Sequence, residues 1–274
     1  MQYLAQTRAR AVKRATLPGM LRESRHEHLL RVLRDEGVLP IGEIAKRLEV
    51  SEATARRDLN DLGKAGRLTR VYGGAVAREQ PVERPFAEEE LDDLAEKRAV
   101  ARHAAGTVRD GDTVLLDIGT TIMELARLLH GREITVATSS LAVYEELRDD
   151  PAVDLILLGG RLRRNYRSLV GHLTEASLHR LYVDRLFLGA SGLLEDGRVL
   201  DTTEVEVPVK RAMLASARQV VLLATAKKFP GTGTARICAA RDIDALVTSQ
   251  GADPGTLDVF REAGVEVAVE VGAR

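Results

Sequence analysis

The second part of the chain alternates between short apolar runs and amphipathic stretches. Helical stretches such as TTIMELARLLHG and EVEVPVKRAM separate the runs. Continuous apolar strands joined by helices are typical of a parallel sheet that is buried on both faces. The pattern therefore predicts a mostly parallel α/β domain. Its seven predicted strands are TVLLD (113–117), ITVAT (134–138), VDLILLGG (153–160), DRLFLGA (184–190), QVVLLA (219–224), DALVTS (244–249) and VEVAVEV (265–271).

Small polar residues follow several of these strands. In parallel α/β folds ligands bind beyond the carboxyl ends of the strands. Gly119, Thr120 and Thr121 follow the first run and precede a helix, where the backbone can approach an anion and the helix start offers N–H groups. Ser139 and Ser140 follow the second run in the same way. Together these loops predict a phosphate-binding site, although helix capping explains any one of them alone.

The first part of the chain has three helical stripes followed by a hairpin pattern. Apolar residues recur at helical spacing within residues 29–33, 41–48 and 55–62, and Ser51 stands where the N-cap of the third helix belongs. The short connection at residues 48–50 makes the last two helices a candidate helix-turn-helix. The following RLTRVYGGAV predicts two strands and a Gly-Gly turn, which form a wing.

The side of the third helix that faces away from its apolar stripe carries polar and basic residues. Such a helix fits the major groove of DNA, where Arg can donate two hydrogen bonds to guanine. The alternative is a small three-helix bundle whose arginines are merely solvated. We predict base contacts from Glu52, Ala53, Thr54 and Arg57, phosphate contacts from Arg56, Lys64 and Arg70, and further DNA contacts from Ser51 and the wing residue Tyr72.

The charge is uneven along the chain. Residues 1–79 contain 16 Lys+Arg against 10 Asp+Glu, and the rest contains 24 against 31. A basic first part favours a polyanionic partner. The single Cys238 excludes an internal disulfide and fits a reducing cytoplasm, and no His lies at a metal-ligand spacing. No apolar run approaches the roughly 20 residues that span a membrane. We expect no metal, no cofactor and no membrane partner.

The helix-turn-helix carries a specific set of residue types at fixed spacing. The set is Arg25, Leu29, Leu33, Ser51, Thr54, Arg56, Asp58 and Leu59, followed by RVYGGA. With these residues the segment resembles the DNA-binding domain of the DeoR family of bacterial transcriptional regulators. The resemblance implies a winged helix-turn-helix that binds double-stranded operator DNA.

The second part resembles the effector domain of the same family through DGDTVLLDIGTT, ITVATSS, LLGG, SLVG, FLGASG and EVEVPVKRAM. The resemblance implies a fold like that of ribose-5-phosphate isomerase and a phosphorylated sugar, or a related intermediate, as effector. With the Ser139 loop, the effector-binding candidates are Asp117, Gly119, Thr120, Thr121, Ser139, Ser140, Gly171, Glu206 and Lys228.

Two stretches depart from the family pattern. Residues 138–140 read Thr-Ser-Ser where the family usually has Thr-Asn-Ser, and residues 224–229 read Ala-Thr-Ala-Lys-Lys-Phe where it usually has Ala-Asp-x-Ser-Lys-Phe. The second departure makes the loop more cationic. It suits an effector with more negative charge, or it means that the usual effector is not bound.

The pattern divides the chain into four segments. Residues 1–19 are either a basic arm or an artefact of the start site, and residues 20–78 form the winged helix-turn-helix. Residues 79–97 are expected to be a linker, whose acidic helical part acts as a solvated spacer. Residues 98–274 form the effector-binding domain.

We expect a cytoplasmic DNA-binding repressor of sugar-metabolism genes that a phosphorylated sugar releases from DNA. Helix-turn-helix proteins work in pairs on symmetric half-sites, so a dimer or tetramer is expected. The rival is an isomerase- or deaminase-type enzyme with a DNA-binding head, in which Glu206, Asp201 or Asp117 performs acid–base chemistry. A third interpretation makes the second domain an oligomerisation module only.

Overall fold

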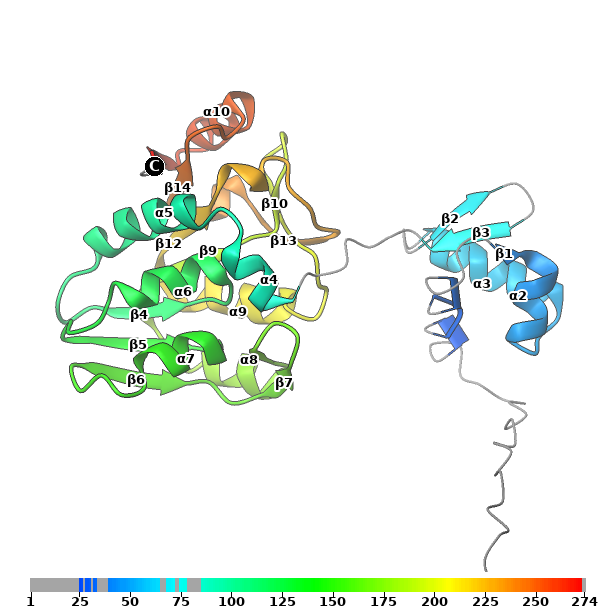
Figure 1. The fold of residues 1–274 in the computed structure, drawn as a ribbon, viewed down its shortest axis with the longest axis horizontal. Coiled ribbons are helices and arrows are strands. Elements are labelled where there is room, and N and C mark those ends of the chain that lie inside the picture. The colour runs from blue at the N-terminus through cyan, green and yellow to red at the C-terminus, as the bar shows by residue number, and fades with distance from the viewer. Residues whose placement is uncertain are drawn as a thin grey trace, which may run out of the picture. The chain divides into compact units, whose positions relative to one another are not determined.

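The computed structural model divides the chain into two compact units, Met1–Gln80 and Pro81–Arg274. It describes residues 25, 26, 28–30, 32, 33, 39–64, 68–71, 74–77 and 85–272, the side chains of residues 64, 69–71 and 74–77 excepted. Figure 1 shows the helices and strands of both units with their labels.

The first unit contains the predicted helix-turn-helix and its hairpin. Helix α2 (Ile41–Arg47) is followed after a short turn by α3 (Glu52–Lys64). Strands β2 (Leu68–Val71) and β3 (Gly74–Ala77) pair antiparallel, and β1 (Leu39–Pro40) adds to the free side of β3. The described residues among 25–33 are helical, while the rest of the first predicted helix lies outside the described residues, so the three-helix count stays a prediction.

The core of the first unit is the set of inward residues that the helical spacing predicts. Ala55, Leu59 and Leu62 of α3 are fully buried and pack with Leu29 and Ile44. Removing apolar side chains from water stabilises the fold by about 25 cal/mol per Å². The burial of one stripe leaves the opposite side of α3 in solvent.

The second unit is built on one parallel sheet. All seven predicted strands are confirmed, and every pair in the sheet is parallel. The sheet order is β15-β14-β12-β9-β4-β5-β6. The strands are β4 (Thr113–Leu116), β5 (Ile134–Thr138), β6 (Val153–Leu157), β9 (Val183–Gly189), β12 (Ala217–Ala224), β14 (Ala245–Ser249) and β15 (Glu266–Glu270).

Helices cover both faces of the sheet, because successive residues of each strand point to opposite sides. Val114 and Leu116 of β4 face a core made with α5 (Leu94–Thr107), α6 (Thr120–Arg127) and α7 (Leu141–Leu147). Leu115 faces the other core, with α8 (His172–Leu178), α9 (Val207–Ser216) and α10 (Pro254–Glu262). Figure 1 shows α5, α6 and α7 together over one face. The mostly parallel α/β class is therefore confirmed.

The strand order reverses between β4 and β9. From β4 the chain steps to β5 and β6 on one side, and it then returns to β9, β12, β14 and β15 on the other. In open α/β sheets such a reversal opens a crevice at the carboxyl ends of the two strands, where ligands bind. Topology alone thus points to the loops after β4 and β9.

The second unit also contains short antiparallel strands, which the sequence pattern did not predict. Strands β7 (Arg161–Arg163) and β8 (Ser168–Val170) form a hairpin. Strands β10 (Gly192–Leu193), β11 (Arg198–Asp201) and β13 (Ala235–Ala239) form a three-stranded sheet. Short 3-10 turns lie at Ala226–Lys228 and Ala240–Asp242.

The acidic segment before the sheet is not a solvated spacer, and the prediction on this point is wrong. It contains α4 (Phe86–Leu91) and the start of α5. Phe86 and Lys97 are buried. Phe86 packs with Met123 and Ala142 of the second unit, so the residues from Pro85 onward belong to that unit's packing. Residues 78–84 lie outside the described residues.

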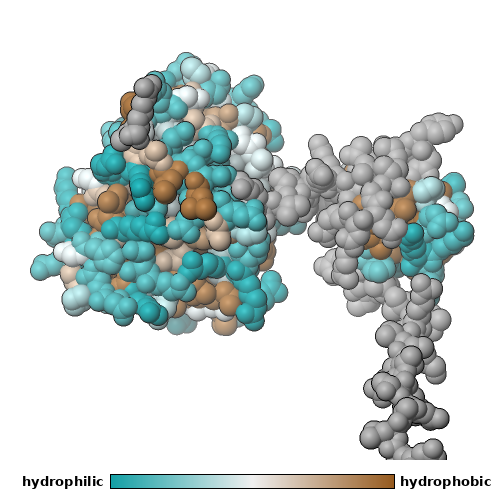
Figure 2. Space-filling view, in the orientation of Figure 1, coloured by the Kyte–Doolittle hydropathy of each residue, from teal (hydrophilic) through white to brown (hydrophobic). Residues whose placement is uncertain are grey.

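The surface of the second unit is mainly hydrophilic in the view of Figure 2, with apolar side chains scattered among polar ones. Exposed apolar residues include Leu91, Leu173 and Tyr182, which lie on different elements. Among the described helices, none combines the length and the hydropathy that a bilayer crossing requires.

Candidate functional site

The outward side of α3 is the first candidate surface. Ser51 caps the helix, because its Oγ accepts the N–H of Thr54 at 3.2 Å, as expected of an N-cap. Glu52, Ala53 and Arg57 are exposed and Thr54 is half-buried. The Nη2 atom of Arg56 lies 3.3 Å from Oε2 of Glu52, four residues earlier on the same helix.

Arg56 and Arg57 point in different directions, because successive residues of a helix are turned by about 100°. Among the described groups Arg57 makes no hydrogen bond or ion pair, whereas Arg56 is tied to Glu52. Of the other predicted DNA contacts, the side chains of Lys64 and Arg70 and the whole of Tyr72 lie outside the described residues.

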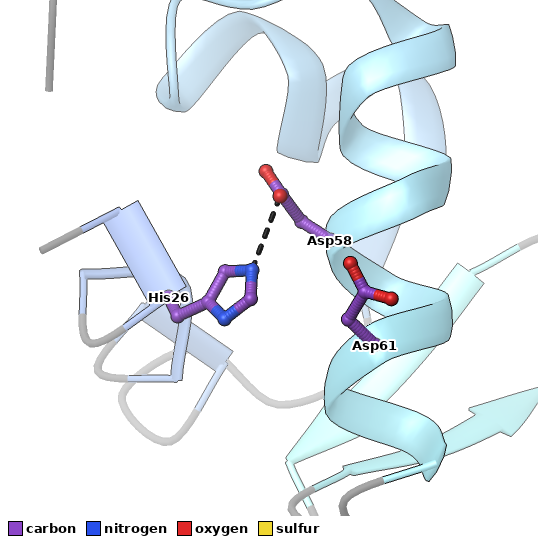
Figure 3. Close-up of side chains that lie close together, drawn as sticks. All are labelled: His26, Asp58 and Asp61. Carbon is purple, nitrogen blue, oxygen red and sulfur yellow. Dashed lines mark hydrogen bonds and ion pairs between the residues drawn. The ribbon is translucent and has the colours of Figure 1, made fainter. Parts of the chain in front are cut away.

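The cluster of His26, Asp58 and Asp61 has the composition of a metal site, but its contacts indicate a structural role. His26, Asp58 and Asp61 bring their ligand atoms within 4.8 Å of one another (Figure 3). Both carboxylate oxygens of Asp58 already accept hydrogen bonds from Arg25, at 2.6 Å and 3.0 Å. A guanidinium this close repels a cation. The cluster therefore fixes α3 to the residues around Arg25.

The second candidate is a cleft at the crevice between β4 and β9. It contains about 570 Å³ of empty space, including its open mouth. We call it the first cleft. Its lining comes from the segment before β4, the loops after β4 and β9, the end of β12 and the turn after it, the β7–β8 turn, the end of β11 and helix α9. The lining residues are Glu89, Lys97, Ile118, Gly119, Thr120, Thr121, Ile122, Tyr166, Gly189, Ala190, Ser191, Asp201, Lys210, Leu223, Ala224, Thr225 and Lys228.

One wall of the first cleft is the N-terminus of α6. Gly119 precedes the helix with φ of 116°, a conformation that only glycine adopts without strain. The first N–H groups of a helix have no partner within it, and the helix dipole makes this end favourable for anions. Thr120 and Thr225 are each more than nine-tenths buried, and their hydroxyls make no hydrogen bond to any described residue. These buried hydroxyls are free to bind a ligand.

Two lysines add positive charge to this wall. Lys97 is buried and its Nζ donates to the backbone carbonyl of Glu89. Burial lowers the pKa of Lys97, and the nearby charge of Lys228 acts in the same direction, while Glu89 opposes both. Lys228 has no carboxylate within ion-pair distance in the part of the chain that the structure describes. An anion in the cleft would relieve the repulsion between the two ammonium groups.

A buried ionic group forms the floor. Nζ of Lys210 bonds a carboxylate oxygen of Asp117, lies 3.6 Å from Oδ2 of Asp201, and donates to the carbonyl of Gly189 at 2.9 Å. Burial acts to lower the pKa of Lys210, but the two carboxylates outweigh it and raise it. A Cβ at Gly189 would stand 3.0 Å from the carbonyl oxygen of Ile118, so glycine permits the close approach of the two loops.

The structure brings only part of the predicted effector set into the first cleft. Gly119, Thr120, Thr121 and Lys228 line it, and Asp117 lies directly beneath it through Lys210. Ser139, Ser140, Gly171 and Glu206 do not line it. The lining adds Lys97, Ser191, Asp201 and Thr225, which were not among the predicted effector residues.

The remaining predicted residues do not line the first cleft, and the buried Oγ of Ser139 has no hydrogen-bond partner in the described part of the chain. Ser140 is the N-cap of α7, since its Oγ accepts the N–H of Val143 at 3.3 Å, and Ser139 is fully buried beside it. Gly171 begins α8 with φ of 96°. Glu206 accepts hydrogen bonds from Ser168 at 2.6 Å and from Arg163. Burial raises the pKa of Glu206, against the effect of these two donors.

The buried charge of Lys97 has no distinctive signal in the sequence. A lysine in an amphipathic helix is usually solvated, and the burial of this one depends on the packing of α4. Ser191 and Thr225 could have been found, because each directly follows a predicted strand. Asp117 was among the predicted effector-binding residues, whereas Asp201 was considered as an acid–base group of the rival enzyme.

Comparison with known proteins agrees with this division of the chain. A model of the DeoR-like helix-turn-helix domain matches residues 25–81, and a model of the DeoR C-terminal sensor domain matches residues 92–250. The transcriptional repressor AccR of Agrobacterium fabrum is 34% identical over 232 residues, covering 84% of this chain and 90% of that protein.

Two further proteins are similar over different extents. The glycerol-3-phosphate regulon repressor of Escherichia coli is 28% identical, covering 90% of this chain and 99% of that protein. The structure of ribose 5-phosphate isomerase A from Methanocaldococcus jannaschii has a TM-score of 0.36 and 18% identity, covering 48% of this chain and 52% of that one. The two relatives matched by sequence are both named repressors, which does not favour the enzyme interpretation. With both domains matched in order, the chain belongs to the DeoR family of transcriptional regulators.

Proposed function

We propose that this protein is a repressor that binds operator DNA through its first unit and releases the DNA when a phosphorylated sugar occupies the first cleft. The observation that carries the ligand half is the wall at the N-terminus of α6. Thr120 at this N-terminus and Thr225 after β12 have hydroxyls with no hydrogen bond to a described residue, and Lys228 lines the same cleft. Helix N–H groups, hydroxyls and lysine are the donors that a phosphate requires.

The rest of the cleft suits the polar body of a sugar. Asp201 and Lys210 offer an acceptor and a donor on the floor, and Ser191 and Thr121 stand at the sides. Carboxylate and hydroxyl groups at such positions can exchange hydrogen bonds with sugar hydroxyls. Ser140 and Glu206 then act through their own local contacts rather than on the ligand, and Ser139 and Gly171 lie outside the lining of the first cleft.

The DNA half of the proposal assigns base contacts to the start of α3 and phosphate contacts to its flank and wing. Glu52, Ala53, Thr54 and Arg57 lie on the outward side and are proposed to meet base edges. Arg56, Lys64, Arg70 and Tyr72 are proposed to hold the backbone. Recognition of two symmetric half-sites requires two such units, so we propose a homo-oligomer, either a dimer or a tetramer.

The repressor role rests on the relatives, several of which bear that name. Release follows from a population shift: the ligand must bind the DNA-incompetent state more tightly than the competent one, since equal affinity for both states changes nothing. A sensor that worked in this way would need no turnover of its ligand.

The test is a fluorescence-anisotropy titration of double-stranded DNA from upstream of the protein's own gene, at a fixed salt concentration because affinity falls steeply with salt. Sugar phosphates are then added one at a time. One compound should release the DNA, and the same compound should fail with Thr120→Val, whose DNA affinity stays that of the parent. Release of the variant at an unchanged concentration would contradict the proposed cleft.

A further inference from the structure

The first described segment of the second unit forms part of the first cleft. We call residues 85–97 the connector; it comprises Pro85, α4, Asp92, Asp93 and the first residues of α5. In the sequence, the connector comes shortly after residues 25–81, which the model of the DeoR-like helix-turn-helix domain matches. Two of its members, Glu89 and Lys97, line the cleft. The connector therefore touches both the proposed ligand site and, through the chain, the DNA-binding unit.

The start of α4 is held against the second unit by an aromatic contact. The ring of Phe86 meets that of Tyr166 edge-on at 5.7 Å, and the guanidinium of Arg167 lies 5.5 Å from the centre of the Phe86 ring. The N–H of Phe86 donates to the carbonyl of Asn165 at 3.1 Å. Tyr166 lines the cleft, so one cleft wall packs directly on α4.

Ion pairs hold the rest of the connector. Nη2 of Arg127 on α6 lies 3.0 Å from Oε1 of Glu90 on α4. Nζ of Lys227 lies 2.7 Å from Oδ2 of Asp93, and Nζ of Lys97 donates to the carbonyl of Glu89. These ion pairs are partly exposed and each contributes little, whereas the buried ring of Phe86 fixes the start of α4. A change in the polar contacts therefore loosens the part of α4 that follows Phe86.

Lys97 is the one of these anchoring groups whose side chain an anion in the first cleft would attract. Its ammonium is buried, it lines the cleft, and it lies close enough to Lys228 for the two charges to repel. A backbone carbonyl carries only a partial charge, so a phosphate is the stronger acceptor for the same ammonium. Nζ of Lys97 has three N–H donors, but a phosphate in the cleft would attract the whole ammonium toward the cleft and so lengthen its bond to the carbonyl of Glu89.

We propose that Lys97 couples the first cleft to the connector: an anionic ligand draws its ammonium from the carbonyl of Glu89, and α4 loosens from the second unit. The inference rests on the proposed function, because it takes the first cleft as the ligand site. The docked α4 belongs to the DNA-competent state and the loosened α4 to the released state. The ligand then shifts the equilibrium by its better contact with Lys97 in the released state.

The chain contains no tryptophan, which makes α4 easy to observe. Leu91 lies on α4 with its side chain 76% exposed, so Leu91→Trp places a single indole on the element that is proposed to move. The full-length Leu91→Trp protein is titrated with inorganic phosphate, glucose 6-phosphate, ribose 5-phosphate and glycerol 3-phosphate. Calorimetry measures binding, and indole anisotropy measures the mobility of α4.

The compound that binds should lower the indole anisotropy with a midpoint equal to the calorimetric Kd. Lys97→Met in the same background should show the low anisotropy without any ligand, because the bond to Glu89 is already lost. Arg102→Met is the matched control: it removes an exposed positive charge from the same helix α5 at a residue that does not line the cleft. The control should keep both the parent anisotropy and the ligand response.

A second variant separates coupling from folding. Glu90→Gln weakens the attachment of α4 to Arg127 without touching the cleft. Coupling free energies act equally in both directions, so this variant should bind the ligand about fivefold more tightly and DNA more weakly. A purely structural role for α4 would not tighten ligand binding.

Three results would count against the inference. A probe that binds while the indole anisotropy stays constant removes the coupling but leaves the proposed function standing. Parent-like anisotropy in folded Lys97→Met shows that this lysine does not hold α4. If none of the probes binds the Leu91→Trp protein, the sugar-phosphate site fails and the inference falls with it.

Discussion

Arg25 and Asp58 form a two-bond ion pair between the start of the described chain and helix α3. Nε of Arg25 donates to Oδ2 of Asp58 at 2.6 Å, and Nη2 donates to Oδ1 at 3.0 Å. The Asp58 side chain is only 3% exposed. Such a pair fixes orientation as well as distance, because both partners are planar. The Arg25–Asp58 ion pair therefore fixes the position of α3 and of its proposed DNA-contacting side.

Asp58→Asn should destabilise the first unit by about 3 kcal/mol, since it leaves the Arg25 guanidinium without its buried counter-charge. Urea unfolding followed by circular dichroism measures the loss. The control is Glu43→Gln, the same chemical change in an exposed pair with Lys46, which should cost less than about 0.5 kcal/mol. Equal effects of the two substitutions would show that the buried pair does not anchor α3.

The same pair makes the stability of the first unit depend on acid. Burial acts to raise the pKa of Asp58, but hydrogen bonds from Arg25 and His26 outweigh it and lower the pKa below its ordinary value. A lowered pKa stabilises the fold fully above the ordinary value of about 4, and this stability is lost as pH falls through the folded pKa. The free-energy difference between the parent and Asp58→Asn should therefore shrink below about pH 4. A constant difference down to pH 2.5 would exclude this titration.

Much of the architecture could be predicted from local pattern. The central strands of the sheet, such as β4 and β9, are apolar runs because they are buried on both faces, whereas the edge strands β6 and β15 are partly exposed. Gly119 and Thr120 could be nominated because they follow the first of these strands. The stripe of Ala55, Leu59 and Leu62 follows from helical spacing in the same way.

What could not be predicted depends on contacts between distant residues. Glu206 accepts a hydrogen bond from Arg163, 43 positions away, and no local sequence pattern predicts that pairing. The burial of Lys97 follows from the packing of α4, whose acidic sequence favoured a solvated spacer. In each case a polar residue with an ordinary surface pattern is buried by a neighbour in space rather than in sequence.

Replacing Arg57 or Arg56 by Ala should change DNA binding in different ways. Arg57→Ala should weaken operator binding by about 1–3 kcal/mol and relax the preference at one base pair. Arg56→Ala should weaken binding to all sequences alike and flatten the dependence on salt, as expected of a phosphate contact. Anisotropy titrations with operator variants at several salt concentrations separate the two effects. If Arg57→Ala weakened binding to all DNA sequences equally, Arg57 would be a phosphate contact rather than a base contact.

Lys210→Met should destabilise the second unit far more than the loss of a surface charge. Asp117 and Asp201 would be left buried without their shared ammonium, which costs about 3–5 kcal/mol. Arg218→Met, at an exposed pair with Asp184, should cost less than about 1 kcal/mol. Thermal unfolding followed by circular dichroism distinguishes them. A stable Lys210→Met protein would mean that the two carboxylates take up protons or water without penalty.

Lys227 and Lys228 are neighbours in sequence, but they should contribute differently to ligand binding. Lys227 is already paired with Asp93 at 2.7 Å, whereas Lys228 lines the first cleft without a carboxylate partner in the described chain. Lys228→Met should therefore weaken the binding of a sugar phosphate by about tenfold or more, the loss of a charge-assisted hydrogen bond. Lys227→Met removes the same charge one residue away together with the pair to Asp93 of the connector, so the affinity should not fall. Calorimetric titration of both variants with the compound that binds the parent decides the matter, because equal losses would indicate general electrostatic attraction rather than a contact made by Lys228.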